Sequence, residues 1–186
     1  MTGFIIAFIA VLLAGLGARD QLAVAALTRV QGSRPTVLVA AVALCLATAQ
    51  LAGWLAQLTA PMLGNSNARL FLAALALGFA GIEALVLAPG REVREPTNSL
   101  AALIVVLTFL QLTDAARFLI FGIALAAAAP MPAVLGGAAG GVVLLTAAWA
   151  SPEWFTWQRL RPVRRTIGAF LLAPALWLGL RAMGLL

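Results

Sequence analysis

The sequence predicts an all-α, polytopic membrane protein of about six transmembrane helices. Of its 186 residues, 63% are hydrophobic and only 10% are charged, whereas soluble domains are about half apolar and a quarter charged. Apolar stretches of about 20 residues recur along the chain, separated by short polar segments or by Pro and Gly. The lipid bilayer is therefore the expected environment.

Six spans are predicted from these apolar stretches. They cover about residues 3–30, 36–58, 68–87, 97–128, 133–150 and 166–186. Two polar connections stand out between them, at residues 91–96 and 151–165. The net charge of +6 does not indicate nucleic-acid binding, because the basic residues are arginines that gather in these short loops.

The distribution of arginine predicts the orientation. The first, third and fifth loops hold Arg29, Arg34, Arg91, Arg94, Arg159, Arg161, Arg164 and Arg165, whereas the second and fourth loops hold only Arg69. The positive-inside rule then places the arginine-rich loops in the cytoplasm and both termini outside. The chain has no Lys and much Ala, which suggests a bacterial source, so we expect a multi-pass protein of the inner (plasma) membrane.

The spans group as three plus three. Residues 1–90 form a first three-helix repeat, 91–96 a cytoplasmic linker and 97–186 a second repeat, which together make one membrane domain. Because three is an odd number, the two halves must have opposite orientations, as in inverted-repeat transporters. The first helix of each half is long and carries charge in mid-span, and Pro35 and Pro130 follow the two charged motifs at similar distances.

The second half carries its charged motif at Gln111, Asp114 and Arg117. A spacing of three places these side chains on one broad face of a continuous helix. Charge at the centre of a bilayer costs a few kcal/mol per residue on insertion scales, so this face should point into the bundle.

The first half carries Arg19, Asp20 and Gln21 in succession. Three consecutive residues cannot share one helix face, and the preceding Gly15 and Gly17 favour a local break in the helix. Intramembrane charges of this kind indicate a site that binds or relays an ion. A buried ion pair that fixes helix packing, or a position nearer the interface, would also explain them.

The first motif, Gly15-Leu16-Gly17-Ala18-Arg19-Asp20-Gln21, resembles that of a transporter family. The family comprises small cation/proton exchangers related to the Golgi manganese transporter, within the lysine-exporter superfamily. Each half of such a protein begins with Glu-x-Gly-Asp-(Lys/Arg)-(Ser/Thr)-Gln. Gly17, Arg19 and Gln21 match this pattern, and Asp20 stands where Ser or Thr would be. In the second motif Asp114 matches and Gln111 replaces the Glu.

The resemblance implies a secondary transporter that exchanges a cation, such as manganese or calcium, for protons. Asp114, Gln111 and Asp20 would bind the ion, the two carboxylates as metal ligands, while Arg19 and Arg117 would gate the site or tune its charge. A divalent cation prefers several oxygen ligands, and the reduced number of acidic residues opposes this assignment. The alternatives are a non-transporting membrane subunit and a transporter of a different small solute.

Other functions receive little support from the composition. With no His in the chain, neither a histidine zinc site nor a Ser-His-Asp triad can form, and we expect neither an enzyme nor a cofactor. The sequence is compatible with a homo- or hetero-oligomer. Glu83, near the end of the third span, is expected to reach the interface or to pair with a loop arginine.

Overall fold

The computed structural model describes residues 1–87, 99–127 and 130–186, and every regular element in these ranges is a helix. Four helices are long and apolar enough to cross a membrane, and two bent pairs raise the number to as many as six if each pair is one span. The elements are α1 (Thr2–Gly15), α2 (Arg19–Gln31), α3 (Pro35–Thr59), η1 (Ala60–Met62), α4 (Ser66–Val86), α5 (Leu100–Leu112), α6 (Ala115–Ala126), α7 (Pro130–Ala150) and α8 (Trp157–Ala182).

Most predicted spans are confirmed to within three residues at each end, and the largest difference concerns the loop predicted at residues 151–165. This loop is shorter than predicted, because α8 begins at Trp157 and includes the arginines assigned to the loop. Arginine favours helices, so its charge alone does not end one. The predicted linker at 91–96 lies outside the described residues.

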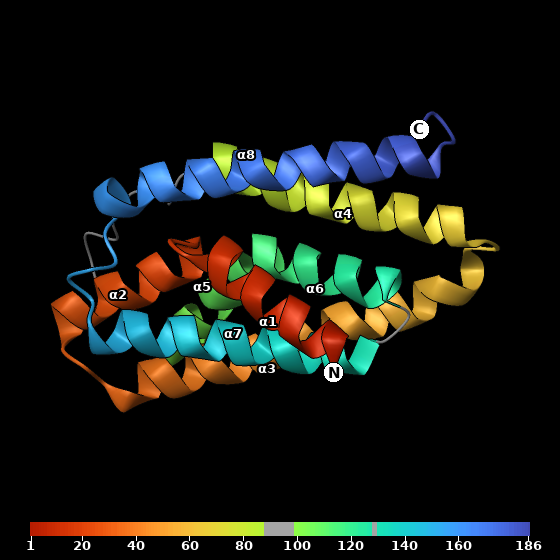
Figure 1. Cartoon of the computed structure of the whole chain (residues 1–186). Coiled ribbons are helices and arrows are strands. Elements are labelled where there is room, and N and C mark those ends of the chain that lie inside the picture. The colour runs from red at the N-terminus through yellow and green to blue at the C-terminus, as the bar shows by residue number, and fades with distance from the viewer. Residues whose placement is uncertain (88–98, 128–129) are drawn as a thin grey trace.

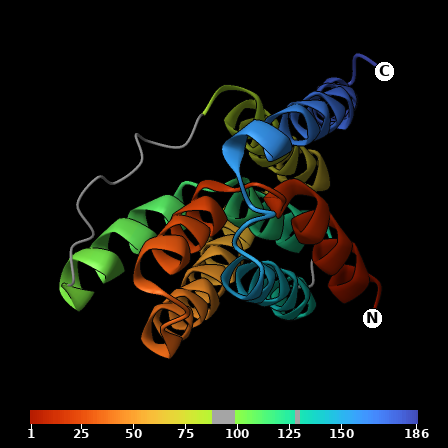
Figure 2. The same ribbon diagram turned by 90° about the vertical axis from the view of Figure 1, so that its left-hand side faces the viewer.

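The helices form two groups. Figure 1 shows α4 and α8 side by side along their lengths, and Figure 2 shows this pair at one side of the remaining helices. Two glycines allow the close contact between α4 and α8. A Cβ atom on Gly168 would lie 2.8 Å from the carbonyl oxygen of Gly81, and one on Gly81 would lie 3.0 Å from the carbonyl oxygen of Gly168.

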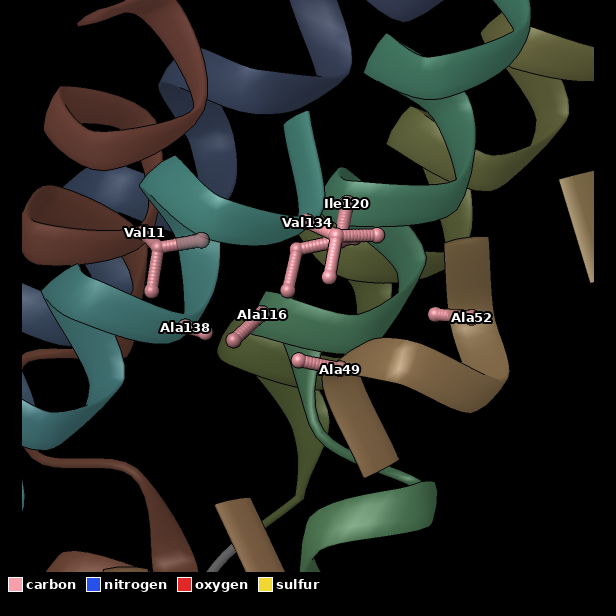
Figure 3. Close-up of a cluster of buried hydrophobic side chains, with 7 residues drawn as sticks. All are labelled: Val11, Ala49, Ala52, Ala116, Ile120, Val134 and Ala138. Carbon is pink, nitrogen blue, oxygen red and sulfur yellow. The ribbon is translucent and has the colours of Figure 1, made fainter. Parts of the chain in front are cut away.

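A second close contact joins α1 to α7, at glycines of α7. A Cβ on Gly140 would lie 3.0 Å from the carbonyl oxygen of Phe8, and one on Gly136 would collide with the carbonyl of Phe4. Small residues let helix backbones approach in this way. A core cluster lies beside this contact, formed by Val11, Ala49, Ala52, Ala116, Ile120, Val134 and Ala138 of α1, α3, α6 and α7 (Figure 3).

The first and fifth loops, beside which the arginines gather, lie at the same end of the bundle, as the predicted topology requires. Arg29 Nη1 donates a hydrogen bond to the carbonyl oxygen of Pro152 at 2.6 Å, and Trp149 Nε1 donates to the carbonyl oxygen of Arg34 at 3.2 Å. Both termini lie at the opposite end (Figure 1). Helices of the two halves pack on each other, α1 on α7 and α4 on α6 and α8.

Candidate functional site

Six charged side chains gather where the two bent helix pairs meet α4 and α8, and we refer to them as the charged cluster. Three are arginines, which remain protonated in proteins, and three are acidic. All except Arg19 are more than nine-tenths buried. The charged cluster consists of Arg19, Asp20, Glu83, Asp114, Arg117 and Arg164.

The first bent pair breaks between α1 and α2, where the sequence predicted a break. Gly17 has φ +73°, a conformation that favours glycine, and the two helices meet at 59°. The side chain of Gln21 spans the break. It accepts a hydrogen bond from the Gly17 N–H at 3.2 Å and donates one to the carbonyl oxygen of Gly15. The break therefore leaves Arg19 and Asp20 in the first turn of α2.

The second bent pair breaks between α5 and α6, which corrects the prediction of a continuous helix through Gln111, Asp114 and Arg117. Asp114 is the N-cap of α6, and its carboxylate accepts a hydrogen bond from the Ala116 N–H at 3.3 Å. Aspartate is a preferred N-cap residue, which explains a break without glycine or proline. All three side chains are buried nevertheless.

The two breaks touch each other through Arg19. Its Nη2 lies 2.9 Å from both the carbonyl oxygen and the hydroxyl of Thr113, the residue between α5 and Asp114. Its Nε donates to Glu83 Oε1 at 3.2 Å. One side chain thus joins the first break, the second break and α4.

Glu83 is the acidic centre of the α4–α8 side of the cluster. It forms an ion pair with Arg164 as well as with Arg19. Nη2 of Arg164 also lies 3.7 Å from Asp114 Oδ1. Glu83 was expected to reach the interface or to pair with a loop arginine. It does pair with an arginine assigned to the fifth loop, but that residue, Arg164, lies in α8 with 0% of its surface exposed.

Arg117 and Gln111 hold the cluster against α3. Nε of Arg117 donates to the hydroxyl of Thr48 at 2.8 Å, and Gln111 Nε2 donates to the carbonyl oxygen of Ala41 at 3.1 Å. Asp20 interacts electrostatically with Asp114, Arg117 and Arg164. Each of the five site residues named from the sequence therefore belongs to the cluster or adjoins it.

Sequence reasoning did not place Glu83, Arg164 or Thr113 in the site. Arg164 follows Arg159 and Arg161 in a segment whose composition is typical of a basic loop. Its burial follows from its position in α8. A clearer signal existed for Thr113, because Thr-Asp before an apolar run is typical of a helix start.

Within the part of the chain that the structure describes, several polar atoms of the cluster have no hydrogen-bond partner. They are Asp114 Oδ1, Arg117 Nη2, Arg164 Nε and Arg164 Nη1, all buried. Buried polar groups normally have partners in proteins or ordered water. These four atoms therefore mark where water or a bound solute would satisfy the site.

As a metal site the arrangement is a poor match. Within the described ranges, no three His, Cys, Asp or Glu side chains are grouped closely enough to hold a metal ion. Asp20 and Asp114 lie near each other, but the arginines already balance the acidic charges of the cluster. A divalent cation would have to displace at least one arginine contact to reach enough oxygen ligands.

Comparisons with known proteins do not assign the chain to a family. No family model matches the sequence, and no significant similarity to a curated protein or a solved structure was found.

Proposed function

We propose that the protein is a proton-coupled secondary transporter whose substrate site is the charged cluster. The observation that supports this most directly is the bond between Arg19 and Thr113, which brings two helix breaks together at buried charges. Discontinuous helices that meet at buried polar groups are the usual way to build a transport site in a membrane.

The proposal includes the arrangement of two inverted halves. Each bent pair is the first span of its half, and α4 and α8, the last helices of the halves, pack against each other. Rocking of one half against the other would expose the cluster alternately to the two sides. We further propose that the arginine-rich end faces the cytoplasm of a bacterial inner membrane.

Charge balance limits what this site can carry. The three arginines cannot release their protons, whereas the three carboxylates can be protonated. A cation exchanger would load its ion by exchanging protons or arginine contacts at Asp114 and Asp20, with Gln111 as a neutral ligand. This version follows the family resemblance. It is favoured by Asp114 Oδ1, which accepts no hydrogen bond from the described residues.

A non-transporting membrane subunit is the second candidate. Asp114 caps α6 and lies within ion-pair distance of Arg164, so it has a structural task whether or not it binds a substrate. In that case its replacement would reduce stability or assembly, and the protein would carry no flux.

The test is proton movement in liposomes that contain the purified protein and an interior pH dye. Manganese, calcium or sodium is added outside, and the unmodified protein is compared with Asp114→Asn and with the exposed control Glu153→Gln. We expect cation-driven proton movement that only Asp114→Asn abolishes. If the folded protein moves protons with none of the three cations, the cation-exchange proposal fails. That result would favour the hypothesis of a non-transporting membrane subunit.

A further inference from the structure

An apolar cavity of about 320 Å³ opens between α3, α4 and the α5–α6 pair. Its wall consists almost wholly of Leu, Ala and Phe side chains, and polar lining is confined to Thr48 and Arg117. Several wall residues are also exposed on the surface of the bundle, among them Leu75 and Phe79. In a bilayer these side chains contact lipid, so the cavity opens toward the membrane interior and not toward water.

Arg117 differs from the other two arginines of the charged cluster. Arg19 and Arg164 each have a carboxylate within ion-pair distance, whereas among the described residues Arg117 has none. Its side chain is 5% exposed, its Nε donates a hydrogen bond to Thr48, and its Nη2 has no hydrogen-bond partner in the described ranges. Asp20 interacts with Arg117 electrostatically but not at ion-pair distance. A buried charge with no carboxylate within that distance is costly, which favours an anion beside it.

The apolar cavity and Arg117 together form a site suited to an amphiphilic ligand. We propose that the cavity binds a small lipophilic monocarboxylate, such as a medium-chain fatty acid, with its carboxylate paired to Arg117. Its apolar chain would lie among the Leu and Phe side chains. A planar guanidinium is well suited to a carboxylate, because it can donate two parallel hydrogen bonds.

The size of the cavity selects a single-chain ligand. Its volume lies at the lower end of the range of small-molecule pockets. A phospholipid with two acyl chains would be too large to enter fully. The carboxylate is also the part of such a ligand that distinguishes it from membrane lipid in general, since the wall itself accepts any apolar chain.

Binding of such an acid at equilibrium does not require flux, so it can be measured apart from transport. The experiment measures binding of radiolabelled octanoate to the purified protein in detergent, with empty micelles subtracted. Unlabelled octanoate, uncharged octanol and phosphatidylglycerol serve as competitors. The variants are Arg117→Gln, Leu75→Trp at the mouth of the cavity, and Leu135→Trp as an exposed control on α7.

We expect saturable binding of octanoate that octanol displaces at least tenfold less well. Arg117→Gln should weaken this binding at least tenfold, Leu75→Trp should abolish it, and Leu135→Trp should leave it unchanged. Equal competition by octanol, or normal binding by Leu75→Trp, would overturn the proposal even if Arg117→Gln fails to fold. Displacement by phosphatidylglycerol at the same concentration as octanoate would overturn the assignment to a single-chain acid.

Discussion

Nη2 of Arg19 and the carbonyl oxygen of Thr113 are 2.9 Å apart, although 94 residues separate them in the chain. The bond joins the start of α2 to the end of α5, and so connects the two interrupted spans at their breaks. A carbonyl at a helix end lacks its partner within the helix. Arg19 supplies that partner and at the same time neutralises Glu83.

Arg19→Gln should reduce transport more than stability. The amide can still donate one hydrogen bond to Thr113, but it leaves Glu83 paired with Arg164 alone. We expect at least a tenfold lower initial rate of proton movement in liposomes and a loss of stability of about 1 kcal/mol, the usual worth of a hydrogen bond. Arg29→Gln, at the other end of α2, is the control and should transport normally. Normal flux in Arg19→Gln would show that transport does not require this arginine.

Glu83→Gln should destabilise the protein strongly. The substitution leaves Arg164, which is wholly buried, without its closest counter-charge. Breaking one partner of a buried ion pair typically costs about 3–5 kcal/mol. Thermal unfolding in detergent should therefore begin at a clearly lower temperature.

Two further variants check the cause of that loss. Glu83→Leu combined with Arg164→Leu removes both charges and should recover part of the stability, because an apolar pair can replace a buried ion pair. The recovery is partial because Arg19 and Asp114 each lose one partner. The exposed Glu153→Gln should unfold like the unmodified protein. If the double variant is less stable than Glu83→Gln alone, the two side chains stabilise the fold by more than the balance of their charges.

Asp114→Asn and Asp114→Ala should separate capping from charge. Asparagine caps a helix about as well as aspartate, whereas alanine does not. We expect Asp114→Ala to be about 1 kcal/mol less stable than Asp114→Asn, and both variants to lose transport. Circular dichroism melting and liposome flux measure the two effects. Retained flux in Asp114→Asn would show that the carboxylate serves as a cap and not as an ion ligand.

The breaks illustrate what the sequence could and could not predict. Gly17 marked the first break, because a glycine just before the polar residues Arg19 and Asp20 favours a backbone conformation that other residues rarely adopt. At the second break the spacing of Gln111, Asp114 and Arg117 favoured a continuous helix, and the capping preference of Asp114 was overlooked. Spans such as α3 and α4 were predictable because their lengths follow from bilayer thickness.

Partners across the bundle could not be predicted in the same way. The ion pairs of Glu83 depend on how α4 packs on α8 and on the first break, and no local pattern in the sequence encodes that packing. In the sequence nothing distinguishes Arg164 from a loop arginine. It is recognised as a helical residue only because α8 begins at Trp157. The sequence therefore indicated buried charge in the bundle but not its complete pairing.

The orientation can be tested with single cysteines. Cys45, the one cysteine of the chain, is buried, so it should not react with a membrane-impermeant maleimide in cells. Ser33→Cys and Asn67→Cys place a thiol at exposed positions at opposite ends of the bundle. We expect Asn67→Cys to be labelled from outside and Ser33→Cys only after the membrane is permeabilised. The reverse pattern would place the arginine-rich end outside.

Gly168→Ala should separate α4 from α8, whereas Gly78→Ala should not. A methyl group on Gly168 would lie 2.8 Å from the Gly81 carbonyl oxygen and 3.0 Å from the backbone nitrogen of Leu85, neither of which can move aside like a side chain. At Gly78 the nearest atom would be the Cβ of Ala175, at an ordinary 3.9 Å. Overpacking of this kind costs about 1–3 kcal/mol.

Because Glu83 and Arg164 lie close to this glycine contact in the sequence, the added methyl group should also disturb their ion pair. We therefore expect Gly168→Ala to lower both thermal stability and flux, while Gly78→Ala, which adds the same methyl group to α4 and raises its helix propensity, keeps both. If both variants retained full stability and flux, the α4–α8 contact would tolerate separation, and its tight packing would not be needed to hold Glu83 against Arg164.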